Sequence, residues 1–159
     1  MQLLKRHRDV MYETNPDSSP ISAIITTLSG RAYLGEANPL AAIQGILTKM
    51  GGLVHRLPPR VPNPVNAKED FADKWADPTK AHLQLEQNFW AWLAQAQRDF
   101  EFVASIRDEG LLREHASKHF KIDMARGESI PSLLSAAAAP GTFTFPPRPI
   151  EPKKPAGFA

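Results

Sequence analysis

The chain has 159 residues, 42% of them hydrophobic, no cysteine, and a formal net charge of +2. This composition predicts a single folded domain and excludes a disulfide scaffold, a cysteine nucleophile and a cysteine zinc site. No apolar run approaches the ~20 residues of a membrane span, and the start lacks a signal-peptide core, so we expect a cytoplasmic protein with no membrane partner. The nearly balanced charge predicts no broad nucleic-acid face.

Apolar residues at helical spacing predict an all-α fold, beginning with two helices before residue 34. The first helix should stop at the Asn15-Pro16 pair. Ser19 is predicted to cap the second helix, with Pro20 at its first position. Beside the apolar face of that helix runs a stripe of hydroxyl side chains, which either allows close helix packing or forms a polar wall facing a ligand. The stripe consists of Ser22, Thr26, Ser29 and Tyr33.

A third helix is predicted to begin at the Asn38-Pro39 pair and to end at glycines 51 and 52. Four prolines then fall within residues 55–64, a stretch that can be neither a regular helix nor a central strand. A short helical piece is expected over residues 67–75.

The longest helix is predicted to open at the Asp77-Pro78 pair and to be broken near Gly110. Its broad apolar stripe should form the core, with polar residues such as Asp99 placed largely elsewhere. A final helix is expected over residues 111–120, and residues 132–139 could form one more weak turn.

Three histidines need a separate interpretation. His115 and His119 lie four residues apart, with Asp123 four further on, which is metal-ligand spacing on one helix face. Because such a histidine pair without another strong ligand is common on solvated helices, we expect no metal there. His7 lies in the apolar stripe of the first helix, where a hydrogen-bonded core histidine is expected rather than a catalytic one.

The first helix also carries Lys5, Arg6 and Arg8 close together, with Asp9 one turn after Lys5. Two interpretations stay open. The residues form a solvated charged face, or they contact a phosphate group beside the hydroxyl stripe.

Three blocks in order, LLKRHRD, PISAIITTLSGRAY and VPNPVNAKEDFADKW, resemble the C-terminal half of bacterial cGAS/DncV-like nucleotidyltransferases. These enzymes are the cyclic-oligonucleotide synthases of CBASS antiphage defence. The resemblance covers about the first half of the chain. It implies that Lys5 and Ser22 contact a nucleoside triphosphate, which would be a ligand of the intact enzyme. Relatives often follow the serine with a base-stacking tyrosine, where this chain has Ala23.

The family's chemistry lies in an N-terminal αβ core, in which a Gly-Ser loop and strand-borne aspartates hold Mg²⁺. This sequence has no Gly-Ser dipeptide and no Asp-x-Asp on an apolar strand. We therefore expect residues 1–139 to be the helical lobe of a longer α+β enzyme, with its N-terminal catalytic core as partner. Mg²⁺ and ATP or other nucleoside triphosphates would serve the intact enzyme, and this chain alone should contain no catalytic residue and be inactive.

Residues 140–159 contain six prolines and predict a flexible, extended tail that ends in Gly157, Phe158 and Ala159. The resemblance implies a role for this end, because some systems of the family encode a ligase that combines ubiquitin-activating and ubiquitin-conjugating features. Such a ligase joins the synthase's C-terminal carboxylate to a target. Ala159 would supply the carboxylate, Gly157 would allow close approach, and Phe158 would anchor in an apolar pocket.

Two other functions remain open from the residues. One is a non-enzymatic helical adaptor that binds a partner through its proline-rich segments. The other is a small metal-dependent protein that uses His115 and His119.

Overall fold

The computed structural model describes residues 1–122 and is mainly helical over them. No β-strand occurs in this part of the chain, where a single isolated bridge joins Pro62 to Asp70. The prediction of an all-α fold is confirmed. Asp123, the expected turn over 132–139 and the tail of residues 140–159 lie outside the described residues. The α-helices are α1 (Gln2–Met11), α2 (Ser22–Ala32), α3 (Pro39–Met50), α4 (Leu85–Ser105) and α5 (Glu109–Phe120), and the short 3₁₀ turns are Pro16–Ser18, Gly51–Leu53, Asp73–Ala76 and Pro78–Leu83.

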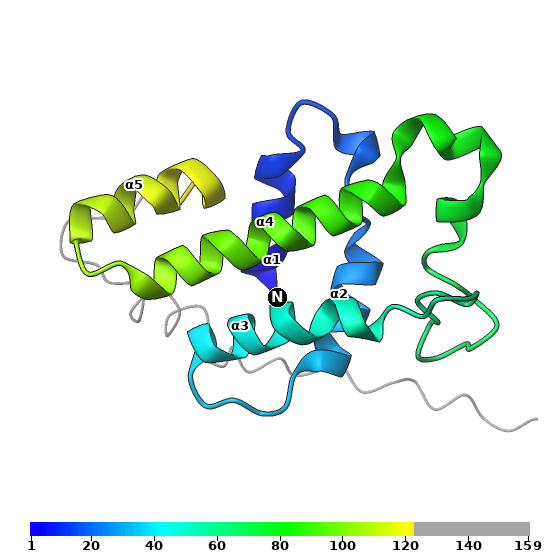
Figure 1. Cartoon of the computed structure of the whole chain (residues 1–159), viewed down its shortest axis with the longest axis horizontal. Coiled ribbons are helices and arrows are strands. Elements are labelled where there is room, and N and C mark those ends of the chain that lie inside the picture. Colours follow the sequence, from blue (N-terminus) through cyan, green and yellow to red (C-terminus); the bar gives the residue numbers. More distant parts are fainter. Residues whose placement is uncertain (123–159) are drawn as a thin grey trace, which may run out of the picture.

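The helices pack around α4, which crosses α1 and lies along α3 (Figure 1). After a short turn, α5 folds back toward α1 and packs against it, while α2 packs against α3. The apolar stripe predicted for α4 forms the centre of the core, with the Trp92 and Phe89 side chains fully buried. None of the helices in residues 1–122 has both the length and the apolar character needed to cross a membrane.

Helix starts follow local side-chain chemistry at α3 but not at α2. The Asn38 side chain accepts hydrogen bonds from the backbone N–H groups of Leu40 and Ala41 at 2.8 and 3.2 Å, which confirms the predicted cap of α3. The predicted cap at Ser19 is wrong, because α2 begins only at Ser22. Ser19 is extended, which suits a cap, but the Pro20 carbonyl oxygen, which would accept a helical bond if α2 began there, accepts instead from the Arg8 guanidinium.

The boundaries of α4 also differ from the prediction. The Asp77-Pro78 pair opens a 3₁₀ turn instead, and Gln84 then adopts a positive φ of 50° that separates this turn from α4. At the other end, α4 stops at Ser105, before the expected break. Gly110 lies inside the first turn of α5, whose N-terminus is capped by the Asp108 side chain.

The proline-rich connector is held in place by one carboxylate rather than by a helix. Asp70 accepts hydrogen bonds from the backbone N–H groups of Arg60, Val61 and Ala72 at 2.6, 2.8 and 2.9 Å. These bonds replace helical ones, so the helix expected over residues 67–75 is reduced to the 3₁₀ turn Asp73–Ala76.

Candidate functional site

A hollow of about 520 Å³ lies between α1 and the start of α2. Sequence reasoning and the family resemblance singled out Lys5 and Ser22, and the structure places both in the wall of this hollow. Three cations and one carboxylate contribute to it, so its lining is net positive. The lining residues are Gln2, Leu3, Lys5, Arg6, Arg8, Asp9 and Ser22.

Lys5 carries the available positive charge of the hollow. Its ammonium group makes no hydrogen bond or ion pair with any residue between 1 and 122. Arg6, in contrast, donates its Nε–H to the carbonyl oxygen of Phe120 at 3.0 Å and so fastens the end of α5 to α1. A ligand in the hollow would therefore meet Lys5 without first breaking a protein contact.

Arg8 connects the two helices that form the hollow. Its guanidinium donates to the carbonyl oxygen of Pro20 at 2.7 Å and to the hydroxyl oxygen of Ser22 at 3.2 Å. The same group pairs with the Asp9 carboxylate at 2.6 Å. Since Arg8 occupies a lone pair of the Ser22 oxygen, the Ser22 O–H is left to donate outward to an anionic acceptor.

The N-terminus of α2 adds to the polarity of this wall. Ser22 is the first residue of α2, and no side chain within the described part of the chain caps this end. Its first backbone N–H groups therefore lack helical acceptors and carry the positive end of the helix dipole. A phosphate is the kind of group that these donors bind.

The hydroxyl stripe of α2 is divided between two places. Ser22 faces the hollow just described, whereas Thr26, Ser29 and Tyr33 line a second hollow of about 560 Å³ between α2, α3 and the start of α1. Ser29 is buried and its hydroxyl has no hydrogen-bond partner among residues 1–122. The stripe is therefore not one continuous polar wall facing one ligand.

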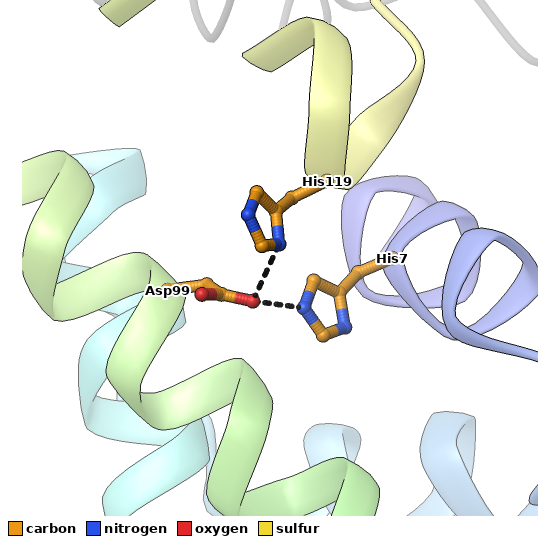
Figure 2. A group of neighbouring side chains, drawn as sticks. All are labelled: His7, Asp99 and His119. Atoms are coloured by element: carbon orange, nitrogen blue, oxygen red, sulfur yellow. Dashed lines mark hydrogen bonds and ion pairs between the residues drawn. The ribbon is translucent and has the colours of Figure 1, made fainter. Parts of the chain in front are cut away.

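The opposite face of α1 contributes to a second group of polar side chains, and Figure 2 shows three of them, His7, Asp99 and His119. The His7 Nε2 atom lies 2.8 Å from the Asp99 Oδ2 atom, and the His119 Nδ1 atom lies 3.1 Å from the same oxygen. The His115 Nε2 atom lies 4.0 Å from the other carboxylate oxygen, and its ring stacks on that of His119. We call these four residues the His–Asp cluster. His7 is thus a buried, hydrogen-bonded residue, as predicted.

Burial sets the charge states in the His–Asp cluster. Burial lowers the pKa of His7, and the hydrogen bond and charge of Asp99 only partly offset this effect. Burial, reinforced by the neighbouring His119, also lowers the pKa of His115. Burial alone would raise the pKa of Asp99, but hydrogen bonds from His7 and Gln95 outweigh it and lower that pKa. The ionised Asp99 carboxylate therefore lies beside the neutral imidazoles of His7 and His115.

Asp99 is the residue of this cluster that sequence reasoning missed. It was expected outside the apolar face of α4, yet it is only 5% exposed. The sequence does indicate that Asp99 is buried, because Asp99 follows Ala96 by three residues and precedes Val103 by four, which is the spacing of the buried face. The expected solvated face is also wrong for His115, which packs against the Phe102 ring and whose side chain is 10% exposed.

Comparison with known proteins shows a similarity over most of this chain. No family model matches the chain. A protein named c-di-GMP synthase, from Roseivirga ehrenbergii, is 28% identical over 137 residues, which cover 82% of this chain and 36% of that protein. The chain therefore spans about a third of the length of the curated relative that it matches.

Proposed function

We propose that this chain is part of a cyclic-nucleotide synthase and that the hollow between α1 and α2 binds the triphosphate of a nucleotide. Two independent observations support this proposal. The hollow gathers an unpaired ammonium, an oriented hydroxyl and a helix N-terminus at one place. The similar protein from Roseivirga ehrenbergii is named c-di-GMP synthase. The single observation that carries most weight is that Lys5 and Ser22 line the same hollow.

Each group in the hollow has a distinct part in binding a triphosphate. Lys5 supplies a mobile point charge, which forms a charge-assisted contact with a phosphate oxygen. Ser22 donates its O–H, and the Arg8 guanidinium holds that hydroxyl in place at 3.2 Å. Because Arg8 is already engaged by Asp9 and by the Pro20 carbonyl, its role is to position Ser22 rather than to bind the ligand.

The finer assignment is to the cGAS/DncV-like nucleotidyltransferases of antiphage defence, in which Mg²⁺ and nucleoside triphosphates serve the intact enzyme. Within residues 1–122, the lining of the hollow does not fit a site for the catalytic Mg²⁺. Asp9 is the only carboxylate that this part of the chain contributes, and Arg8 pairs with it. In this proposal Mg²⁺ is held by a catalytic core elsewhere in the longer protein, and residues 1–139 supply one wall of the cleft.

The proposal extends to the chain end, which lies outside the described residues. Ala159 would be joined to a target by a ligase of the ubiquitin-activating and ubiquitin-conjugating type. Gly157 would let the chain end approach the catalytic groups of the ligase closely, and Phe158 would anchor it in an apolar pocket of the ligase. Incubation with that ligase and ATP should give a covalent adduct through Ala159, detected by mass spectrometry. Deleting residues 157–159 should abolish the adduct, and an adduct that persists would show that this end has no such role.

Substitution of Lys5 tests the nucleotide site. Lys5→Ala should weaken the binding of a non-hydrolysable GTP analogue about ten- to a hundredfold, since a charge-assisted contact contributes roughly 1.5–3 kcal/mol. Ser22→Ala should weaken it less. The melting temperature of Lys5→Ala should stay at the wild-type value, because the ammonium has no partner in residues 1–122. Isothermal titration calorimetry and thermal melts provide the two measurements.

Lys68→Ala is the matched control, since Lys68 is exposed on the connector and lies outside the hollow. Its affinity for the analogue should equal that of the wild type. A Lys5→Ala protein that binds the analogue as tightly as the wild type, or one that is merely less stable, would refute the proposed site.

A further inference from the structure

The His–Asp cluster joins three helices that are far apart in the sequence. His7 comes from α1, Asp99 from α4, and His115 and His119 from α5. The His7, Asp99 and His119 ligand atoms all lie within 4.8 Å of one another. Three of the five histidines of the chain therefore meet at one carboxylate. This cluster has no part in the proposed nucleotide site, which uses the other face of α1.

The distances suit a metal ion held between these side chains. Ligands of a tetrahedral zinc ion at about 2.0–2.2 Å are about 3.3–3.6 Å from each other. The Asp99 Oδ2 atom lies 2.8 Å from His7 and 3.1 Å from His119, so a small outward shift of the carboxylate would admit an ion. The other carboxylate oxygen accepts a hydrogen bond from Gln95 at 2.9 Å, which orients it as the outer partner of a metal ligand does.

Hydrogen bonding alone leaves two features of the cluster unexplained. The His115 Nε2 atom is buried without a hydrogen-bond partner, and it points toward Asp99 at 4.0 Å. A buried polar atom of this kind normally has a partner. Within residues 1–122, all ion pairs of Asp99 are with histidines, and no lysine or arginine neutralises this buried carboxylate. A cation at the centre of the cluster would account for both features.

The ligand types select the metal. Imidazole nitrogens with one carboxylate suit zinc and related transition metals, whereas Mg²⁺ and Ca²⁺ prefer sets of oxygen ligands. His7, Asp99 and His119 would fill three tetrahedral positions, and His115, once its side chain rotates toward them, would fill the fourth and leave none open, as in structural zinc sites. The aromatic rings of Phe100, Phe102 and Phe120 lie around the imidazoles and limit access of water. His119 is the most exposed ligand and gives the ion a route from solvent.

We propose that the His–Asp cluster binds one structural zinc-type ion through His7, Asp99 and His119, and that His115 becomes the fourth ligand after a rotation of its side chain. The expectation of no metal rested on two histidines of one solvated helix face. The structure changes that premise, because it adds the buried His7 and Asp99 from two other helices and leaves the His115 side chain only 10% exposed. Such an ion would tie α5 to α1 and α4 at the point where the three helices meet.

Metal uptake by the full chain tests this proposal. The purified chain, freed of metal by a chelator and then dialysed against Co²⁺, should bind one ion per chain and show the intense visible absorption of tetrahedral cobalt. Zn²⁺ should displace the cobalt and raise the melting temperature. A folded chain that takes up no ion at micromolar metal, or one that gives only the weak spectrum of octahedral cobalt, would overturn the proposal.

Variants locate the ion. Asp99→Asn keeps the shape and most hydrogen bonds of the cluster but removes its charge, and His119→Ala removes one ligand from the exposed side. Both should lose the cobalt absorption and the zinc-dependent rise in melting temperature. His82→Ala is the control, because His82 is exposed in the turn before α4 and lies outside the cluster. Uptake retained by Asp99→Asn, or lost by His82→Ala, would show that zinc binds elsewhere on the surface.

Discussion

At the scale of single residues, Asp70 shows how one carboxylate can fix an irregular segment. The connector after α3 contains Pro58, Pro59, Pro62 and Pro64, and prolines cannot donate backbone hydrogen bonds. Asp70 compensates by accepting three backbone N–H bonds from both sides of the connector. Burial by itself would raise the pKa of Asp70, but these bonds outweigh it and lower the pKa.

Asp70→Asn should therefore reduce stability in a pH-dependent way. We expect a loss of about 1.5 kcal/mol at pH 7, the lower end for bonds to a charged group, because Asp70 is only partly buried. A carboxyl whose folded-state pKa is lowered stabilises above its unfolded pKa, about 3.9, and loses that contribution as the pH falls through the folded value. The gap between wild type and Asp70→Asn should accordingly close below about pH 4.

Urea unfolding at pH 7, 4 and 3 measures this gap. Asp17→Asn, at an exposed aspartate in the turn before α2, serves as control and should change the free energy of unfolding by less than about 0.5 kcal/mol. A gap for Asp70→Asn that stays constant across these pH values would mean that its charge does not hold the connector.

At the scale of helices, the sequence predicted the existence of each α-helix but not all of their ends. The helical spacing of apolar residues predicted the buried faces of α2, α3 and α4, because tertiary packing follows that pattern. The cap of α3 was also predictable, since Asn38 acts on backbone groups within three residues. The start of α2 was not, because the Pro20 carbonyl is bound by Arg8 from another helix.

The candidate sites show the same limit. The family resemblance assigned Lys5 and Ser22 to one nucleotide site. The sequence pattern by itself does not place the two residues side by side, because no local rule states how two helices cross. For the His–Asp cluster, each of His7 and Asp99 occupies a buried position in an otherwise apolar stripe. Two such polar residues in separate apolar stripes indicate a buried hydrogen-bonded pair, so the contact between His7 and Asp99 was predictable from the sequence. Their partner His119 depends on how α5 folds back, which long-range packing decides.

At the scale of the whole molecule, α1 links the two candidate sites. One face of α1 presents Lys5 and Arg8 to the hollow beside α2, and the other directs His7 into the His–Asp cluster between α4 and α5. Arg6 adds a third tie by binding the carbonyl of Phe120 at the end of α5. The position of the Lys5 ammonium relative to Ser22 therefore depends on contacts that α1 makes with every neighbouring helix.

This arrangement predicts that the chain binds a nucleotide without converting it. Nucleotidyl transfer needs metal ions held by carboxylates beside the phosphates. Within residues 1–122, the hollow between α1 and α2 contains one carboxylate, Asp9, and Arg8 already pairs with it at 2.6 Å. Incubation of the chain with Mg²⁺ and labelled GTP and ATP should therefore yield no linear or cyclic oligonucleotide, as resolved by thin-layer chromatography.

The c-di-GMP synthase of Roseivirga ehrenbergii, incubated in parallel, is the positive control. A metal-dependent product that is lost on Asp9→Asn would mean that this hollow carries out the transfer itself, and that the division of roles proposed here between binding wall and catalytic core is wrong.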